Sequence, residues 1–284
     1  MLKDVTLGQF FPGNSPLHKM DPRAKILLSI VYIVAIFCAQ NILAFALLIL
    51  SALFLILISR ISLVTILRGI KPILFVLLFT TLILIFQSDP SGVPPVFRLE
   101  IPIFSTVWYP TIYMSGIIRA ILTAVRVVVL ILGTSIFLTY TTSPITLTDA
   151  LESLLSPLKR LHVPVHDFAM MMTIALRSIP TLIEETEKIM NAQKSRGADF
   201  SSGSIIRRAR ALVPVLIPLL VSAFKRADEL AVAMECRCYR GDNGRTKLNK
   251  LAYHLRDGVA FLVMALFFVG ILYLNHLGLF GIGL

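Results

Sequence analysis

Five long apolar runs dominate this sequence and leave few folds open to it. They are Ile26–Ala39, Ile42–Ile58, Ile73–Phe86, Val127–Leu138 and Val259–Leu274. A helix that crosses a bilayer needs about 20 predominantly apolar residues. The chain is 56% apolar and 15% charged, against roughly 45–50% and about 25% in a soluble domain. The runs exclude a soluble enzyme, a disordered chain and a disulfide scaffold, and they predict an all-α polytopic membrane protein.

The apolar runs predict about five transmembrane helices in two parts of the chain. Residues 1–140 are expected to form an N-terminal bundle, with spans at residues 22–39, 42–58, 72–86 and 112–140. The third span is short and is expected to include residues before Pro72. Asp21 and Pro22 provide an N-cap and a first helical residue, and Gln40-Asn41 must reverse the chain. Residues 254–284 are expected to form a C-terminal transmembrane helix.

The formal net charge of +11, from 27 Lys and Arg against 16 Asp and Glu, indicates how the chain lies in the membrane. In a soluble protein this balance would suggest a nucleic-acid partner, but cytoplasmic loops of membrane proteins collect Lys and Arg. One side of the spans carries Lys3, Lys19, Arg23, Lys25, Arg60, Arg68, Lys71, Lys247, Lys250 and Arg256, and the other side only Arg98. This asymmetry predicts a cytoplasmic N-terminus, an external loop at residues 87–110, an external C-terminus and no nucleic-acid partner.

Residues 141–253 are too charged to span a membrane and too amphipathic to be a loop. Their periodicity predicts a cytoplasmic domain of three helices, at about residues 147–161, 164–195 and 204–239. The second helix contains Pro180, and the third contains Pro214 and Pro218. An interior proline favours a kink. We therefore expect two long helices, each interrupted by proline in its first half.

The second and third of these helices end alike. When Arg196 is aligned with Arg237, Ser195 matches Cys236 and Gly197 matches Cys238. Gly197 is expected to stop the second helix, because glycine is the usual residue just beyond a helix C-terminus. A single arginine at a helix C-terminus is explained by the helix dipole, which it stabilises by roughly 0.3–1 kcal/mol. Two at matched positions, each between small side chains, favour a docking surface that a partner's backbone approaches closely.

Other chemically suggestive residues carry weaker signals. Arg119 and Arg126 lie seven residues apart within the fourth span. Intramembrane arginines usually face the bundle interior or reach the interface, so a structural role is one interpretation and a substrate pathway is the other. Three cysteines make no disulfide framework, and Cys236 and Cys238 are read as small packing residues rather than metal ligands. The segment Gly241–Thr246 has neither the spacing nor the lysine of a phosphate-binding loop, so no catalytic residue is predicted.

The matched helix ends resemble the paired Ala-Arg-Gly motifs of one protein family, the transmembrane T components of energy-coupling factor (ECF) transporters. The motifs here are Ala192–Gly197 and Ala233–Gly241, where Ser195 replaces the usual first Ala and Cys236-Arg237-Cys238 replaces Ala-Arg-Gly. Cys238 adopts left-handed backbone angles less freely than glycine does. The resemblance extends to His18–Lys25, Leu176–Pro180 and Gly244–Thr246, and so covers nearly the whole chain.

The resemblance implies a non-catalytic coupling subunit in the plasma membrane of a prokaryote. Such a subunit links two ABC-type ATPases to a membrane-embedded S component that takes up vitamins or metal ions. It implies that ATP and Mg²⁺ bind on the ATPases and that this chain holds no cofactor or metal. The residues implied at the ATPases are Arg196, Arg237, Ser195, Gly197, Cys236 and Cys238. Those implied at the S component are Phe168, Met171, Met172, Ala175, Leu212, Leu216 and Leu219.

A second interpretation belongs to a different functional class. An ion- or solute-conducting membrane protein with a regulatory cytoplasmic helical domain would place Arg119 and Arg126 along a pore. It would leave the duplicated arginine ends without a purpose. Co-purification separates the two, because a coupling subunit carries two ATPases and a channel forms homo-oligomers without them.

Overall fold

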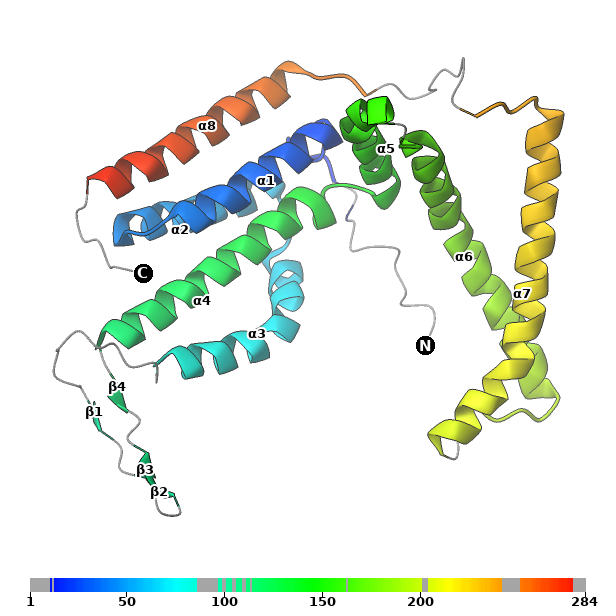
Figure 1. Cartoon of the computed structure of the whole chain (residues 1–284), viewed down its shortest axis with the longest axis horizontal. Coiled ribbons are helices and arrows are strands. Elements are labelled where there is room, and N and C mark those ends of the chain that lie inside the picture. Colours follow the sequence, from blue (N-terminus) through cyan, green and yellow to red (C-terminus); the bar gives the residue numbers. More distant parts are fainter. Residues whose placement is uncertain are drawn as a thin grey trace. The chain divides into compact units, whose positions relative to one another are not determined.

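The computed structural model describes residues 11, 13–85, 97–98, 101–103, 106–108, 111–112, 114–161, 163–200, 204–241 and 251–277 (Figure 1). The chain divides into two compact units. The membrane unit comprises Phe10–Ser143 and Leu251–Leu284, and the helical domain comprises Pro144–Lys250 with Met1–Gln9.

The described residues of the membrane unit form five α-helices. Its elements are α1 (Pro22–Cys38), α2 (Ile42–Ser59), α3 (Leu63–Ile85), α4 (Met114–Thr134), a π-helical segment (Ser135–Tyr140) and α8 (Leu255–His276). Between α3 and α4 lie two short antiparallel strand pairs, β1 (Phe97–Arg98) with β4 (Thr111–Ile112) and β2 (Ile101–Ile103) with β3 (Thr106–Trp108). The first helix begins as predicted, because Asp21 is its N-cap and accepts a hydrogen bond from the Arg23 backbone.

Three helices among the described residues are long and apolar enough to cross a membrane, namely Ile42–Ser59, Gly116–Tyr140 and Leu255–His276. A shorter apolar helix, Lys71–Ile85, forms the second part of α3. Helix α3 as a whole begins at Leu63, nine residues before Pro72, and continues through the proline. The third span was expected to include residues before Pro72, and α3 does so. The all-α membrane fold is therefore confirmed, while the total of five spans stays a prediction.

The core of the membrane unit lies where α1, α2, α4 and α8 meet. Its largest fully buried apolar side chains include Leu28, Tyr32, Phe45, Leu48 and Ile271. Gly133 brings α4 close to α1, because a Cβ placed at this position would overlap the Tyr32 ring. The Tyr32 ring also packs against the rings of Phe137 and Phe267.

A buried polar cluster joins the N-termini of α1 and α8. The Asp257 carboxylate accepts hydrogen bonds from the Asp21 backbone at 3.0 Å and from the His254 backbone at 2.9 Å, so one side chain caps two helices. The Lys25 ammonium donates to the Thr141 carbonyl at 2.8 Å, just beyond the π-helical segment. A second polar cluster lies at the other ends of α1 and α8, where Asn275 donates to the Cys38 carbonyl.

Where the structure describes the helical domain, it consists of three α-helices. They are α5 (Pro144–Leu155), which continues as a 3₁₀ segment (Ser156–Leu161), α6 (Val165–Ser195) and α7 (Ile205–Cys236). Helix α5 thus starts three residues earlier than predicted and changes to a 3₁₀-helix after Leu155. Helix α5 packs on the start of α6, where His166 hydrogen bonds to the buried Glu152 at 2.9 Å. All three interior prolines, Pro180, Pro214 and Pro218, remain inside helices.

Candidate functional site: the paired ends of α6 and α7

Helix α6 ends in a Schellman motif built around Gly197. The Gly197 backbone donates to the Lys194 carbonyl at 2.9 Å, and the Ala198 backbone donates to the Gln193 carbonyl at 3.0 Å. Gly197 has a φ of 86°, in the left-handed region that glycine adopts without a Cβ penalty. Arg196 occupies the C-cap position. The predicted glycine stop is therefore confirmed, with the arginine at the last position before the chain turns away.

Helix α7 repeats the same motif bond for bond. The Cys238 backbone donates to the Glu235 carbonyl at 2.9 Å, and the Tyr239 backbone donates to the Met234 carbonyl at 3.1 Å. Arg237 is the C-cap, and Cys238 has a φ of 55°. The helix therefore stops at Cys236 rather than at the predicted Tyr239, because the left-handed residue ends the helical ladder. Cysteine thus occupies the glycine position without changing the motif.

Both capping arginines are exposed, and so are the small residues beside them, Ser195, Gly197, Cys236 and Cys238. Within the part of the chain that the structure describes, neither guanidinium takes part in a hydrogen bond or an ion pair. A guanidinium presents five donors in a fixed fork that matches carboxylates and carbonyls. The two ends therefore offer equivalent, unoccupied donor groups to a partner.

The two ends lie far apart because α6 and α7 cross as an antiparallel pair (Figure 1). Glu185 of α6 accepts hydrogen bonds from Ser222 and, at 2.9 Å, from Arg226. Nearer the end of α6, the Gln193 amide donates to the Pro214 carbonyl at 3.5 Å. The end of α7 lies 22 residues beyond Pro214, or about 33 Å at 1.5 Å per residue. The structure thus separates Arg196 from Arg237.

Helix α7 exposes an apolar stripe on the face opposite the crossing. The exposed members of the stripe are Leu212, Val213, Leu216, Ile217, Leu220, Val221 and Phe224. They recur at intervals of four residues and so follow one side of the helix. Val215, Ser222 and Arg226 lie on the side that meets α6. Leu219, which sequence reasoning grouped with Leu212 and Leu216, is half-buried.

The first half of α6 also exposes apolar side chains. Phe168, Met171, Met172 and Ala175 are all exposed, whereas Val165 and Ala169 are buried. The exposure of these four leaves them free to contact a partner, and that contact stays a prediction. Val213, Ile217, Leu220, Val221 and Phe224 were not among the residues expected from the sequence, although the four-residue spacing from Leu212 to Leu216 continues to Leu220 and Phe224.

Arg126 has a structural partner within the membrane unit. Its guanidinium donates to the carbonyl of Ala39, the C-cap of α1, at 2.8 Å. It also lies 5.2 Å from the centre of the Phe45 ring. A cation at this point satisfies a terminal carbonyl and complements the dipole of α1. This geometry favours the structural role over a place along a pore.

Comparison with known proteins identifies the family. The sequence profile of the CbiQ family, described as a cobalt transport protein, matches residues 13–248. Relatives from several organisms carry the name energy-coupling factor transporter transmembrane protein EcfT. The protein from Clostridium kluyveri is 48% identical over 92% of this chain and 93% of its own length. Those from Acidaminococcus fermentans and Bacillus subtilis are 46% and 44% identical, over 97% and 90% of this chain and 98% and 93% of their own lengths. The chain therefore belongs to the CbiQ family, as a transmembrane T component of the energy-coupling factor transporters.

Proposed function

We propose that the chain couples two cytoplasmic ABC-type ATPases to a membrane-embedded S component that takes up vitamins or metal ions. It acts as a non-catalytic subunit, and ATP and Mg²⁺ bind on the ATPases. It resides in the plasma membrane of a prokaryote, with a cytoplasmic N-terminus and an external C-terminus. The names and lengths of the EcfT relatives support this assignment.

The observation that carries the proposal is the repetition of one helix end at two distant points. Each end combines a C-cap arginine, small flanking residues and the same pair of Schellman hydrogen bonds. Two copies of one ATPase would each require such an end. A separation of about 33 Å along α7 leaves room for two separate subunits. One ATPase therefore docks at Arg196 and the other at Arg237.

The crossing of α6 and α7 supplies a mechanism of transmission. Each helix is more than 30 residues long, and the two are held together by Glu185, Ser222, Arg226 and Gln193. When ATP draws the two ATPases together, the docked ends approach each other. The helices then turn about their crossing, and their apolar faces move with them.

The apolar faces of α6 and α7 are the docking surface for the S component. Phe168, Met171, Met172 and Ala175 on α6, with Leu212, Leu216 and the half-buried Leu219 on α7, contribute to it. Methionine is unbranched and polarisable and so adapts to more than one partner surface. Substrate selection then belongs to the S component, and the chain itself contacts no transported molecule.

Alanine substitution of the two capping arginines tests the proposal. Removing one member of a buried, hydrogen-bonded charge pair costs about 2–5 kcal/mol, whereas loss of a dipole-complementing surface cation costs only about 0.3–1 kcal/mol. Arg196→Ala or Arg237→Ala should therefore weaken ATPase retention in pull-downs and abolish coupled uptake. The double variant should lose both ATPases, because the second contact of a bivalent clamp depends on the first.

The controls separate docking from folding. Lys225 is an exposed cation in the middle of α7, and Lys225→Ala should leave ATPase retention and uptake unchanged. Arg237→Lys should restore function only in part, because an ammonium does not reproduce the planar fork. Near-normal ATPase retention and uptake in both single alanine variants would reduce the arginines to ordinary helix caps and reject the coupling assignment.

A further inference from the structure

A wedge-shaped cavity of about 920 Å³ opens between α2 and α8 of the membrane unit. The two helices approach each other near Gly270, where a Cβ would lie 3.7 Å from Leu47. Toward the end of α2 and the start of α8 they diverge, and Leu57, Ile58, Leu255 and Val259 line the gap. The cavity is therefore closed at one end of the helices and open at the other.

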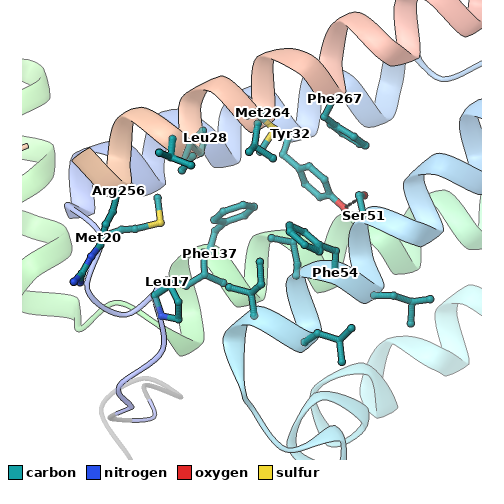
Figure 2. A pocket seen from close by; sticks show the side chains of 18 of the residues that line it. Leu17, Met20, Leu28, Tyr32, Ser51, Phe54, Phe137, Arg256, Met264 and Phe267 are labelled. Atoms are coloured by element: carbon teal, nitrogen blue, oxygen red, sulfur yellow. Dashed lines mark hydrogen bonds between the residues drawn. The ribbon is translucent and has the colours of Figure 1, made fainter. Parts of the chain in front are cut away.

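The floor of the cavity is a built surface. Leu28 and Tyr32 of α1 and Phe137 of the π-helical segment lie beneath it, each no more than 3% exposed. Tyr32 hydrogen bonds to Ser51 at 3.1 Å, at the end away from Arg256 (Figure 2). The tyrosine hydroxyl thus has a hydrogen-bond partner within the protein and does not require one from a molecule bound in the cavity.

The rim of the cavity is apolar and uncovered. Phe54 and Leu57 on α2 are 52% and 75% exposed, and Leu255 and Val259 on α8 are 92% and 63% exposed. In a chain that spans the membrane, this rim faces acyl chains and not water. A continuous apolar wall, buried below and exposed above, admits a hydrocarbon segment from the bilayer.

The length of the cavity matches one leaflet. Its lining on α8 runs from Arg256 to Phe267, which is about 16 Å at 1.5 Å per residue. The hydrocarbon core of a bilayer is about 30 Å thick, so one leaflet accounts for about 15 Å.

A basic side chain stands at the open end. Arg256 lines the cavity beside Met20, at the end opposite Ser51 (Figure 2), and it is exposed. It is the second residue of α8, where the span begins and lipid headgroups lie. Arg60, also exposed, follows the lining residue Ile58 by two positions at the end of α2. An arginine at this depth matches a phosphate-bearing anionic headgroup.

We propose that this cavity binds an acyl chain of an anionic phospholipid, whose headgroup is held by Arg256. The acyl chain lies along α8 over Leu28, Tyr32 and Phe137, in the leaflet on the side where α8 begins. The bound lipid fills the space between α2 and α8 and keeps the two helices apart at this end. The inference rests on the membrane unit alone and does not depend on how α6 and α7 bind their partners.

Lipid retention after detergent exchange tests the proposal. The full chain is reconstituted in vesicles of equal parts phosphatidylglycerol and phosphatidylcholine. It is then extracted, washed extensively in detergent and analysed by native mass spectrometry. We expect one retained lipid for each chain, with phosphatidylglycerol preferred.

A tryptophan in the cavity should block binding. Val263 lines the cavity and is exposed, so Val263→Trp should fill the cavity without overpacking the core and abolish lipid retention. Leu266→Trp, on the same helix but outside the lining, should retain lipid as the unmodified chain does.

A second variant, at Arg256, tests binding of the headgroup and leaves the packing of the cavity unchanged. Arg256→Gln should lower the preference for phosphatidylglycerol over phosphatidylcholine about fivefold, the factor expected for one basic residue near an anionic surface. Arg210→Gln, an exposed arginine on α7, should leave the preference unchanged. Equal retention by Val263→Trp and Leu266→Trp, or a headgroup preference indifferent to Arg256→Gln, would overturn the proposal. So would cysteine crosslinking from position 263 to a co-purified membrane protein in place of lipid retention.

Discussion

At the residue scale, Cys238 shows how one position preserves a motif at an energetic cost. Its φ of 55° is a left-handed conformation, which costs a residue with a Cβ roughly 1–2 kcal/mol. Gly197 adopts the same conformation at the end of α6 without that cost, and no atom lies within 4 Å of a Cβ placed there. The two ends therefore share geometry and differ in strain.

Relief of this strain is a direct expectation. Cys238→Gly should stabilise the end of α7 by about 1 kcal/mol and leave the position of Arg237 unchanged. Gly197→Ala should destabilise the end of α6 by a similar amount. Hydrogen exchange of the last-turn amides measures both effects. Cys236→Ala, at a position that is helical, is the control and should alter exchange little, and faster exchange in Cys238→Gly would contradict the expectation.

Local sequence rules predicted much of this geometry at the residue scale. Gly197 marked the end of α6, and the alignment of Arg196 with Arg237 indicated that α7 ends in the same way. Helix-end chemistry acts over five or six residues, so a linear pattern records it. Local rules predicted that α7 would continue to Tyr239, whereas it ends three residues earlier, at Cys236. They did not predict this because cysteine, at position 238, seldom adopts left-handed backbone angles.

At the element scale, the start of α1 depends on a residue that is 236 positions away in the sequence. Asp257 is almost completely buried and accepts hydrogen bonds from the Asp21 and His254 backbones. Arg23 adds a hydrogen bond to the Leu251 carbonyl and lies 5.1 Å from the centre of the Tyr253 ring. Asp21 and Pro22 allow the start of α1 to be predicted from the local sequence. No local sequence pattern indicates that the start of α1 lies against α8.

Removal of the shared cap should destabilise the membrane unit. Asp257→Ala leaves the Asp21 backbone donor without its acceptor and removes a carboxylate that attracts the buried Lys25 ammonium. Removing one member of a buried pair of charged groups lowers the free energy of unfolding by about 3–5 kcal/mol. Chemical unfolding of the purified chain measures the change in free energy. Asp257→Asn, which keeps an oxygen acceptor but not the charge, should fall between the wild type and Asp257→Ala.

A matched control lies at the start of α6. Asp167 is an exposed acidic residue in the first turn of that helix, and Asp167→Ala should cost only about 0.3–1 kcal/mol. Equal destabilisation by Asp257→Ala and Asp167→Ala would show that the buried cluster contributes no more than an ordinary helix-end charge.

At the scale of the whole molecule, the distribution of charge predicts an orientation of the chain. Among the residues that flank the predicted spans, Lys and Arg gather on one side and Arg98 alone lies on the other, so the positive-inside rule predicts a cytoplasmic helical domain. The apolar runs at residues 42–58, 127–138 and 259–274 lie in the three described helices that are long and apolar enough to cross a membrane, and a run of this kind can be recognised from the sequence alone. They did not predict the cavity between α2 and α8, which depends on the divergence of two helices distant in sequence.

The native cysteines provide a test of this orientation. Cys236 and Cys238 are exposed at the end of α7, whereas Cys38 lies at the end of α1 and is half-buried. In a Cys38→Ala chain in intact cells, a membrane-impermeant maleimide should leave Cys236 and Cys238 unlabelled until the membrane is permeabilised. In a chain without native cysteines, Gln40→Cys, at the exposed α1–α2 turn, should be labelled from outside. Labelling of Cys236 or Cys238 in intact cells, with Gln40→Cys protected, would invert the topology and place the arginine ends beyond the reach of any cytoplasmic ATPase.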